Sequence, residues 1–192
     1  MAGVPFARIE TPRLVLRHFA ERDLAAFTAY RNDPEIARFQ SWSGIADAEA
    51  RAFVAEQAAN QPGIPGCWFQ FAIARREGDA LIGDCALRLD EAQPRIAEIG
   101  YTLSRASQGC GYAGEALGAM LDWAFATLAL RRVRALTDTR NAPSIALLER
   151  LGFQREAHLR QDAWHKGEWC DEYLYAVLSD EWRARREGRP RG

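Results

Sequence analysis

The stretch SQGCGYAGEALGAML, residues 107–121, places three glycines in front of an apolar pattern with helical spacing. Gly109, Gly111 and Gly114 fall within six residues, and apolar residues then recur at positions 117, 120, 121, 124, 125 and 128. Positions spaced as i, i+3, i+4, i+7, i+8 and i+11 share one face of an α-helix. The stretch therefore predicts a glycine-rich turn that leads into an amphipathic helix.

A turn of this kind can bind an anion at the start of its helix. The first amides of a helix have no intrahelical partner and lie at the positive end of the helix dipole. Glycines can also serve only to allow positive φ in a tight turn, which is the simpler explanation for one glycine. Three glycines favour the anion-binding interpretation.

Two other phosphate-binding motifs come close to this pattern. The three glycines satisfy G-x-G-x-x-G, and Asp138 ends the next expected strand, as in a dinucleotide-binding protein. However, the preceding strand alternates and carries Glu98, whereas a parallel Rossmann strand is buried on both faces. A dinucleotide site therefore stays a minor alternative. A Walker loop is absent because Ala116 stands where its lysine is needed.

The remaining periodicities indicate a single α+β domain. Three alternating segments after residue 66 are separated by turn residues and predict an antiparallel meander. The expected strands are residues 13–19, 67–75, 80–90, 95–104, 131–139, 153–161 and 171–179, and the expected helices besides the glycine-led one are residues 21–32, 46–60 and 142–152. The 192 residues suit one domain, with a core over 9–182 and a frayed basic tail over 183–192.

Composition narrows the class of partner. The formal net charge is −1, so there is no overall positive field of the kind that attracts nucleic acid. Neither a secretory signal nor an apolar run of membrane-spanning length is found, so we expect a cytoplasmic protein without a membrane partner. The four cysteines lack metal-ligand spacing, and no metal is expected. The oligomeric state stays open, with a homodimer as one option.

Five segments resemble one known family. SQGCGYAGEAL resembles the Q-x-x-G-x-A pyrophosphate loop of the GNAT superfamily of N-acetyltransferases, with Gln108, Gly111 and Ala113 on the motif positions. ETPRLVLRHF, AEIGYTLS, NAPSIALLERLGF and WCDEYLYAVL are similar, in the same order, to its RimJ/RimL-like branch. The resemblance covers residues 9–182. Gly114 stands where members of the branch often carry threonine, so no hydroxyl contact to phosphate is expected there.

The resemblance implies a GNAT-like, largely antiparallel, splayed sheet with helices on both faces, and acetyl-CoA as the cosubstrate. The pyrophosphate would lie on the amides of residues 109–114, and the pantetheine arm would pair with the strand at residues 99–103. The residues implied in binding acetyl-CoA are Ile99, Tyr101, Leu103, Gln108, Gly109, Cys110, Gly111, Tyr112, Ala113, Gly114 and Asn141.

Acetyl transfer to an amine needs a base for the ammonium proton and an acid for the departing thiolate. Glu98, on the strand that the resemblance puts beside the thioester, is the first candidate base, and Asp162 is the second. Asn141 and Ser144 have the spacing of a helix cap, which explains both without catalysis. The resemblance instead implies that Asn141 binds pantetheine and that Ser144 protonates the thiolate.

The acceptor site is expected between the loop that contains Trp42 and the hairpin that contains Trp164, although both tryptophans can equally cover the rim of the core. We therefore expect an N-acetyltransferase that acts on a primary amine. A protein N-terminal α-amine is the leading acceptor class, and a small-molecule amine is the second. The alternative from another class is a non-catalytic acyl-CoA-binding module.

Overall fold

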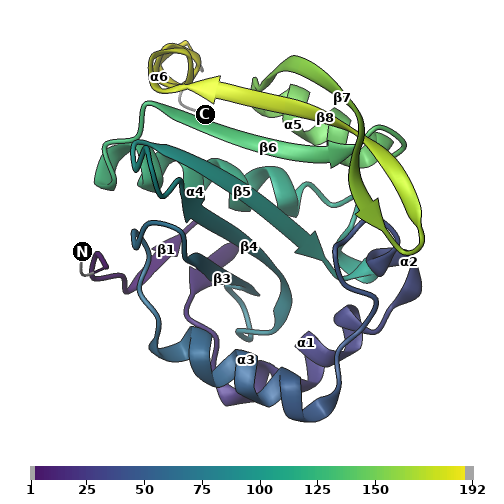
Figure 1. The fold of residues 1–192 in the computed structure, drawn as a ribbon. Helices are drawn as coiled ribbons and strands as arrows, with labels where there is room; N and C mark the ends of the chain where they lie inside the picture. The colour runs from purple at the N-terminus through teal and green to yellow at the C-terminus, as the bar shows by residue number, and fades with distance from the viewer. Residues whose placement is uncertain (1–2, 189–192) are drawn as a thin grey trace.

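The computed structural model describes residues 3–188, which form one mixed sheet covered by helices on both faces (Figure 1). The strands are β1 (Arg8–Glu10), β2 (Leu14–Arg17), β3 (Trp68–Arg75), β4 (Leu81–Leu89), β5 (Ile96–Leu103), β6 (Arg132–Asp138), β7 (Gln154–His165) and β8 (Glu168–Leu178). The helices are α1 (Leu24–Arg31), α2 (Pro34–Ala37), α3 (Asp47–Ala59), α4 (Tyr112–Thr127), α5 (Ala142–Leu151) and α6 (Ser179–Glu187), with short 3₁₀ turns at Glu21–Asp23 and Arg105–Ser107. None of the helices within residues 3–188 is long and apolar enough to cross a membrane.

The sheet divides in its middle. Its order is β1-β2-β3-β4-β5-β6-β8-β7, and every neighbouring pair is antiparallel except β5 and β6. The parallel pairing of β5 with β6 ends at Glu98 and Arg134, whereas β5 stays paired with β4 as far as Leu103. One edge of β5 therefore has no strand neighbour over residues 99–103. This confirms the expected splayed, largely antiparallel α+β sheet.

The two faces of the sheet bury separate apolar clusters, because alternate residues of a strand point to opposite sides. Phe71 and Ile73 of β3 pack in a large cluster with residues of α4 and α5. Ala72, between them, joins the second cluster, which α1 and α3 complete. In Figure 1, α4 accordingly lies behind the sheet, and α1 and α3 lie on its other side. Residues of β5 thus face α4 at odd positions and the opposite side at even positions.

Helix α4 begins where the glycine pattern predicts. Gly111 precedes it in the left-handed region, at φ 78°, and Leu117, Met120 and Leu121 are fully buried on its inner face. Helix α5 begins at Asn141, whose side chain accepts a hydrogen bond from the Ser144 amide at 3.3 Å. These helix boundaries agree with the sequence analysis.

Three features differ from the sequence analysis. Strand β1 and helix α2 were not expected, since three or four residues are too short to show a period. The tail expected over 183–192 is helical as far as Glu187, because Trp182 is buried and its Nε1 donates to Asp122 of α4 at 2.8 Å. The rest of that tail, residues 189–192, lies outside the described residues.

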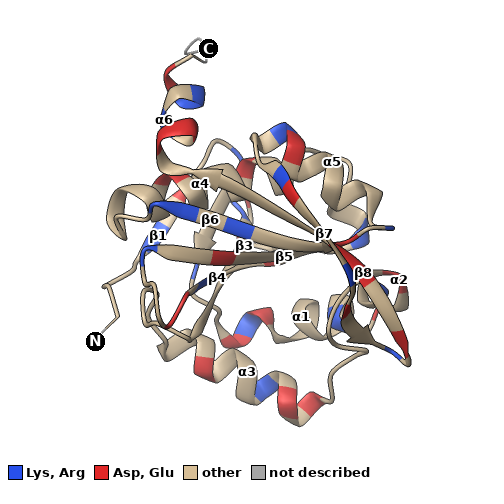
Figure 2. Cartoon of the chain, turned by 45° about the horizontal axis from the view of Figure 1, so that its top comes forward, with Lys and Arg blue, Asp and Glu red and all other residues tan. Residues whose placement is uncertain are grey.

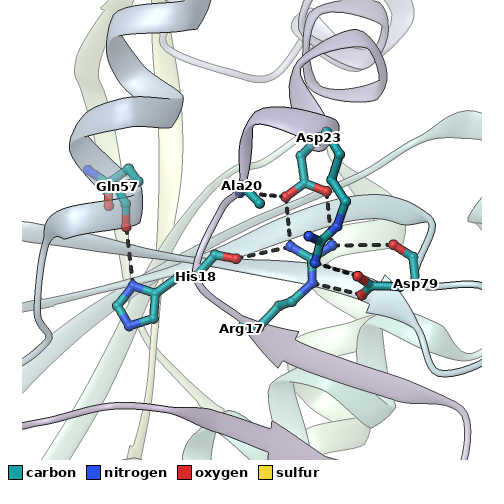
Figure 3. A network of polar contacts seen from close by, with 7 residues as sticks. Arg17, His18, Ala20, Asp23, Gln57 and Asp79 are labelled. Carbon is teal, nitrogen blue, oxygen red and sulfur yellow. Dashed lines mark hydrogen bonds and ion pairs between the residues drawn. The ribbon is translucent and has the colours of Figure 1, made fainter.

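An ion-pair network ties β2 to the segment before α1 (Figure 3). The Arg17 guanidinium donates to both carboxylate oxygens of Asp23, at 2.7 and 2.9 Å, and to Asp79 at 2.8 Å. Asp23 also accepts from the Ala20 amide at 2.8 Å. The side chains of Arg17 and Asp23 are only 11% and 2% exposed, so this pair is shielded from water.

We predict that Asp23→Ala lowers the free energy of unfolding by about 3 kcal/mol, because removal of one partner leaves a buried charge only partly compensated. Urea denaturation measures the change. Arg22→Ala is the control, since Arg22 pairs with Asp79 at the surface, and it should cost roughly 0.5 kcal/mol or less. Equal losses for the two variants would contradict the structural importance of Asp23.

Candidate active site

The loop that leads into α4 leaves its backbone donors free. Within residues 3–188, no hydrogen bond uses any amide of residues 109–114 as a donor. Gly109 and Gly111 both have positive φ, 74° and 78°, and residues with ordinary φ lie between and after them. Alternation of this kind turns successive amides toward a common point and forms an anion-binding nest. The expected pyrophosphate loop therefore has the required shape and free donors.

Two carbonyl groups of the same loop are already occupied. The Cys110 carbonyl accepts from Arg13 Nη1 at 3.1 Å, and the Gln108 carbonyl accepts from the Cys110 thiol at 3.5 Å. Tyr112 is buried, with the Arg13 guanidinium 4.5 Å from its ring centroid. The loop thus has free N–H donors beside carbonyl oxygens that already accept hydrogen bonds. This arrangement gives the loop a positive electrostatic character, which suits a diphosphate.

The open edge of β5 continues from this loop. Gln108 Nε2 donates to the Leu103 carbonyl at 3.0 Å, and Gln40 Nε2 donates to the Tyr101 carbonyl at 3.4 Å. Since backbone groups alternate in direction along a strand, Ile99 presents its groups at the same edge. The three β5 residues expected to bind the cosubstrate thus direct their backbone N–H and C=O groups toward the open edge of the sheet. The side-chain amides of Gln40 and Gln108 occupy the positions where a bound chain would pair with this edge.

A cavity of about 1150 Å³ joins the loop, the β5 edge and the start of α5. Its lining includes Gly109, Gly111, Ala113 and Gly114 from the loop side and Tyr101, Leu103, Gln108, Asn141 and Ser144 from the other elements. Phe39 and Gln40, which follow α2, also line it. Tyr112 also lines the cavity. Ile99 and Cys110 do not line it, although each is adjacent in sequence to residues of the site.

Ser144 is held by two partners at the cavity wall. Its hydroxyl lies 2.7 Å from the Tyr101 hydroxyl, and its amide donates to Asn141. Burial raises the pKa of Tyr101 to about 12, so this phenol stays protonated at neutral pH. Sequence reasoning assigned only the backbone of Tyr101 and missed its hydroxyl, because Tyr101 and Ser144 are 43 positions apart in the sequence and no local pattern shows the contact.

Glu98 lies on the opposite face of β5, away from the cavity, at the point where β5 and β6 part. Its Oε2 pairs with Arg88 and with Arg134, each at 3.2 Å, and its side chain is 16% exposed. Figure 2 shows basic positions along β6, the strand next to β5. Among residues 3–188 no partner of its Oε1 is found, so one carboxylate oxygen can still accept a proton or an N–H.

The other predicted residues lie apart from the cavity. Trp42 packs against the α1–α3 cluster, with Arg31 4.5 Å from its ring centroid. Trp164 is 58% exposed on β7 and contacts Trp169. Asp162 is exposed on the same strand, at a break in its pairing with β8. Their roles in acceptor binding or catalysis stay predictions.

Glu172 of β8 is a carboxylate that the sequence analysis overlooked. It pairs in register with Asp138 and lies on the same side of the sheet as Glu98. Burial raises its pKa, and the charge of Asp162 adds to the increase. Within residues 3–188, no group of three or more His, Cys, Asp or Glu side chains is arranged so that it could hold a metal ion.

Comparisons with known proteins agree with this geometry. Residues 13–154 match the family described as an acetyltransferase (GNAT) domain. The chain is 34% identical to an uncharacterized N-acetyltransferase p20 of Bacillus licheniformis, over 90% of this chain and 96% of the relative. It is 27% identical to the [ribosomal protein uS5]-alanine N-acetyltransferase of Escherichia coli, over 94% and 95% of the two chains.

Solved structures extend the likeness to the whole fold. A GNAT-family acetyltransferase from Bacillus anthracis superposes with a TM-score of 0.81 at 26% identity, over 90% of this chain and 99% of that one. Mycobacterium smegmatis RimJ, in complex with CoA-disulfide, superposes with a TM-score of 0.76 at 25% identity, over 88% and 83%. The resemblance to the RimJ/RimL-like branch is thereby confirmed. This chain belongs to the GNAT superfamily of N-acetyltransferases, enzymes that use an acyl-CoA as donor.

Proposed function

We propose that this enzyme transfers the acetyl group of acetyl-CoA directly to a primary amine, with a protein N-terminal α-amine as the leading acceptor class. The observation that carries the donor assignment is the row of free amides at residues 109–114 beside the open edge of β5. The acceptor class rests on the likeness to the uS5-alanine N-acetyltransferase, and a small-molecule amine is the second class.

The donor would bind along the cavity floor. The amides of residues 109–114 hold the diphosphate, and the backbone groups of Tyr101 and Leu103 pair with the pantetheine amides. Gln40 and Gln108 would give up their hydrogen bonds to the two β5 carbonyls as that pairing forms, because these carbonyls then accept from the incoming chain. When bound, acetyl-CoA supplies the thioester whose acetyl group is transferred and the thiolate that leaves.

The acceptor amine would approach from the opposite face of the sheet. The gap between β5 and β6 begins beyond Glu98, so a group in the gap is reachable from both sides. Glu98 Oε1 takes the proton of the ammonium, while Arg88 and Arg134 hold Oε2 and fix the carboxylate. On the cavity side, Ser144 Oγ gives its proton to the departing sulfur, and the Tyr101 hydroxyl donates to Ser144.

An acceptor screen tests this function. Peptides with a free N-terminus, their Nα-blocked counterparts, polyamines and aminoglycosides are incubated with acetyl-CoA and followed by mass spectrometry. We expect acetylation of free peptides and none of the blocked ones. Acetylation of small amines alone would support the second acceptor class. Binding of CoA without turnover of any amine would contradict catalysis and favour an acyl-CoA-binding module.

Substitution of Asn141 separates helix capping from cosubstrate binding. Asn141→Ser keeps a capping oxygen, so the free energy of unfolding should stay within about 0.3 kcal/mol of wild type, whereas Asn141→Ala should lose about 1 kcal/mol. Both variants lack the amide group, and calorimetry should show several-fold weaker CoA binding for both. Wild-type affinity in Asn141→Ser would leave Asn141 as a cap only.

Replacement of Glu98 tests the base. An α-amine has a pKa near ~8, so it needs a base mainly below that pH. We expect Glu98→Gln to lower turnover about a hundredfold at pH 6.5 and progressively less toward pH 9. Glu156→Gln is the matched control, because Glu156 also pairs with an arginine of β6 but lies on β7, which β6 and β8 separate from β5. A ratio of rates that does not change with pH would exclude Glu98 as the base.

A further inference from the structure

A carboxylate lies unexpectedly close to the proposed diphosphate site. Glu115 is in the first turn of α4, directly after the loop of free amides. A negative charge at that position should repel a bound diphosphate and weaken its binding. Glu115 is among the residues that line the cavity, but its side chain is only 16% exposed and its carboxylate is hydrogen-bonded to the connection between β1 and β2.

Three donors from that connection bind the Glu115 carboxylate. Thr11 Oγ1 and the Arg13 amide donate to Oε1, at 2.6 and 2.9 Å, and Arg13 Nε donates to Oε2 at 2.6 Å. Burial alone would raise the pKa of Glu115, but the hydrogen bonds from Thr11 and Arg13 outweigh it and lower the pKa below its usual value. The carboxylate is therefore ionised and its charge is neutralised by Arg13.

Arg13 continues from Glu115 into the loop itself. Its Nη1 donates to the Cys110 carbonyl at 3.1 Å, and its guanidinium stacks on the Tyr112 ring. Its Nη2 lies 3.5 Å from the position that a Cβ on Gly111 would occupy. One side chain thus contacts residues on both sides of the left-handed Gly111 and links them to the first turn of α4.

We propose that Thr11, Arg13 and Glu115 form a clamp that holds the loop with its amides pointing outward, and that these three residues position the diphosphate site. A loop rich in glycine loses much conformational entropy when it is ordered by a ligand. Contacts that order it beforehand remove this cost from binding and so raise affinity. This proposal rests on the proposed function, since it assumes that the loop binds the diphosphate of CoA.

Two interpretations of Glu115 predict opposite results. If its charge merely repels the ligand, Glu115→Gln and Glu115→Ala should bind CoA more tightly than wild type. If it holds the loop, both variants should bind CoA more weakly, and we expect about a tenfold rise in Kd. Arg13→Lys keeps the positive charge but loses the planar fork that reaches Glu115 and Cys110 together, so it should also weaken binding.

The experiment is calorimetric titration of CoA into each variant, together with ligand-observed NMR of pantetheine, which lacks the diphosphate. We expect the affinity for pantetheine to stay within twofold of wild type. Glu156→Ala is the matched control, because it removes an arginine-paired glutamate on another part of the sheet, and it should bind both ligands normally. Thermal unfolding of every variant checks that the fold is intact, and Ala at position 115 favours the helix.

The outcomes are distinguishable. Tighter or unchanged CoA binding in the Glu115 variants would overturn the clamp, and so would an equal loss for CoA and pantetheine. Should Glu115→Ala not fold, the milder Arg13→Lys decides by the same comparison. A wild-type protein that binds CoA no better than pantetheine would instead contradict the proposed function, before any variant is considered.

Discussion

The parting of β5 and β6 after Glu98 is the constraint on which the rest of this site depends. In a continuous sheet the backbone groups of Ile99, Tyr101 and Leu103 would be used by a neighbouring strand. The splay leaves them at an open edge, and the chain then turns directly into the loop of free amides. An extended ligand with amides at one end and a diphosphate at the other matches this arrangement, because its amides can pair with the β5 edge and its diphosphate can bind the loop amides.

The same parting explains how two substrates can meet. The pleat of β5 sends Tyr101 toward the cavity and Glu98 toward the other face, so the groups proposed for opposite tasks lie on opposite sides of one strand. Ser144 of α5 lines the same cavity, and its hydroxyl lies 2.7 Å from the Tyr101 hydroxyl. In the proposed mechanism a proton is therefore taken on one face and delivered on the other, without one group serving both tasks.

The sequence predicted the features that show a regular period or that depend only on residues close together in the chain. The alternation in β3 to β5, the apolar face of α4 and the cap at Asn141 depend on neighbours in the chain, and each was found where expected. The contacts of Gln40 with the Tyr101 carbonyl, of Thr11 with Glu115 and of Glu98 with Arg134 join residues that are 61, 104 and 36 positions apart in the sequence. No local pattern encodes such contacts, so they emerge only when the sheet is assembled.

Donor binding is proposed to depend on the loop amides and the β5 edge. The most direct measurement is a titration of the ¹⁵N-labelled protein with CoA, followed through its backbone amide resonances. We expect the largest shifts in residues 109–114, with further shifts at Tyr101 and Leu103. Saturation with CoA that leaves those amide resonances in place, with the shifts in another part of the fold, would contradict it.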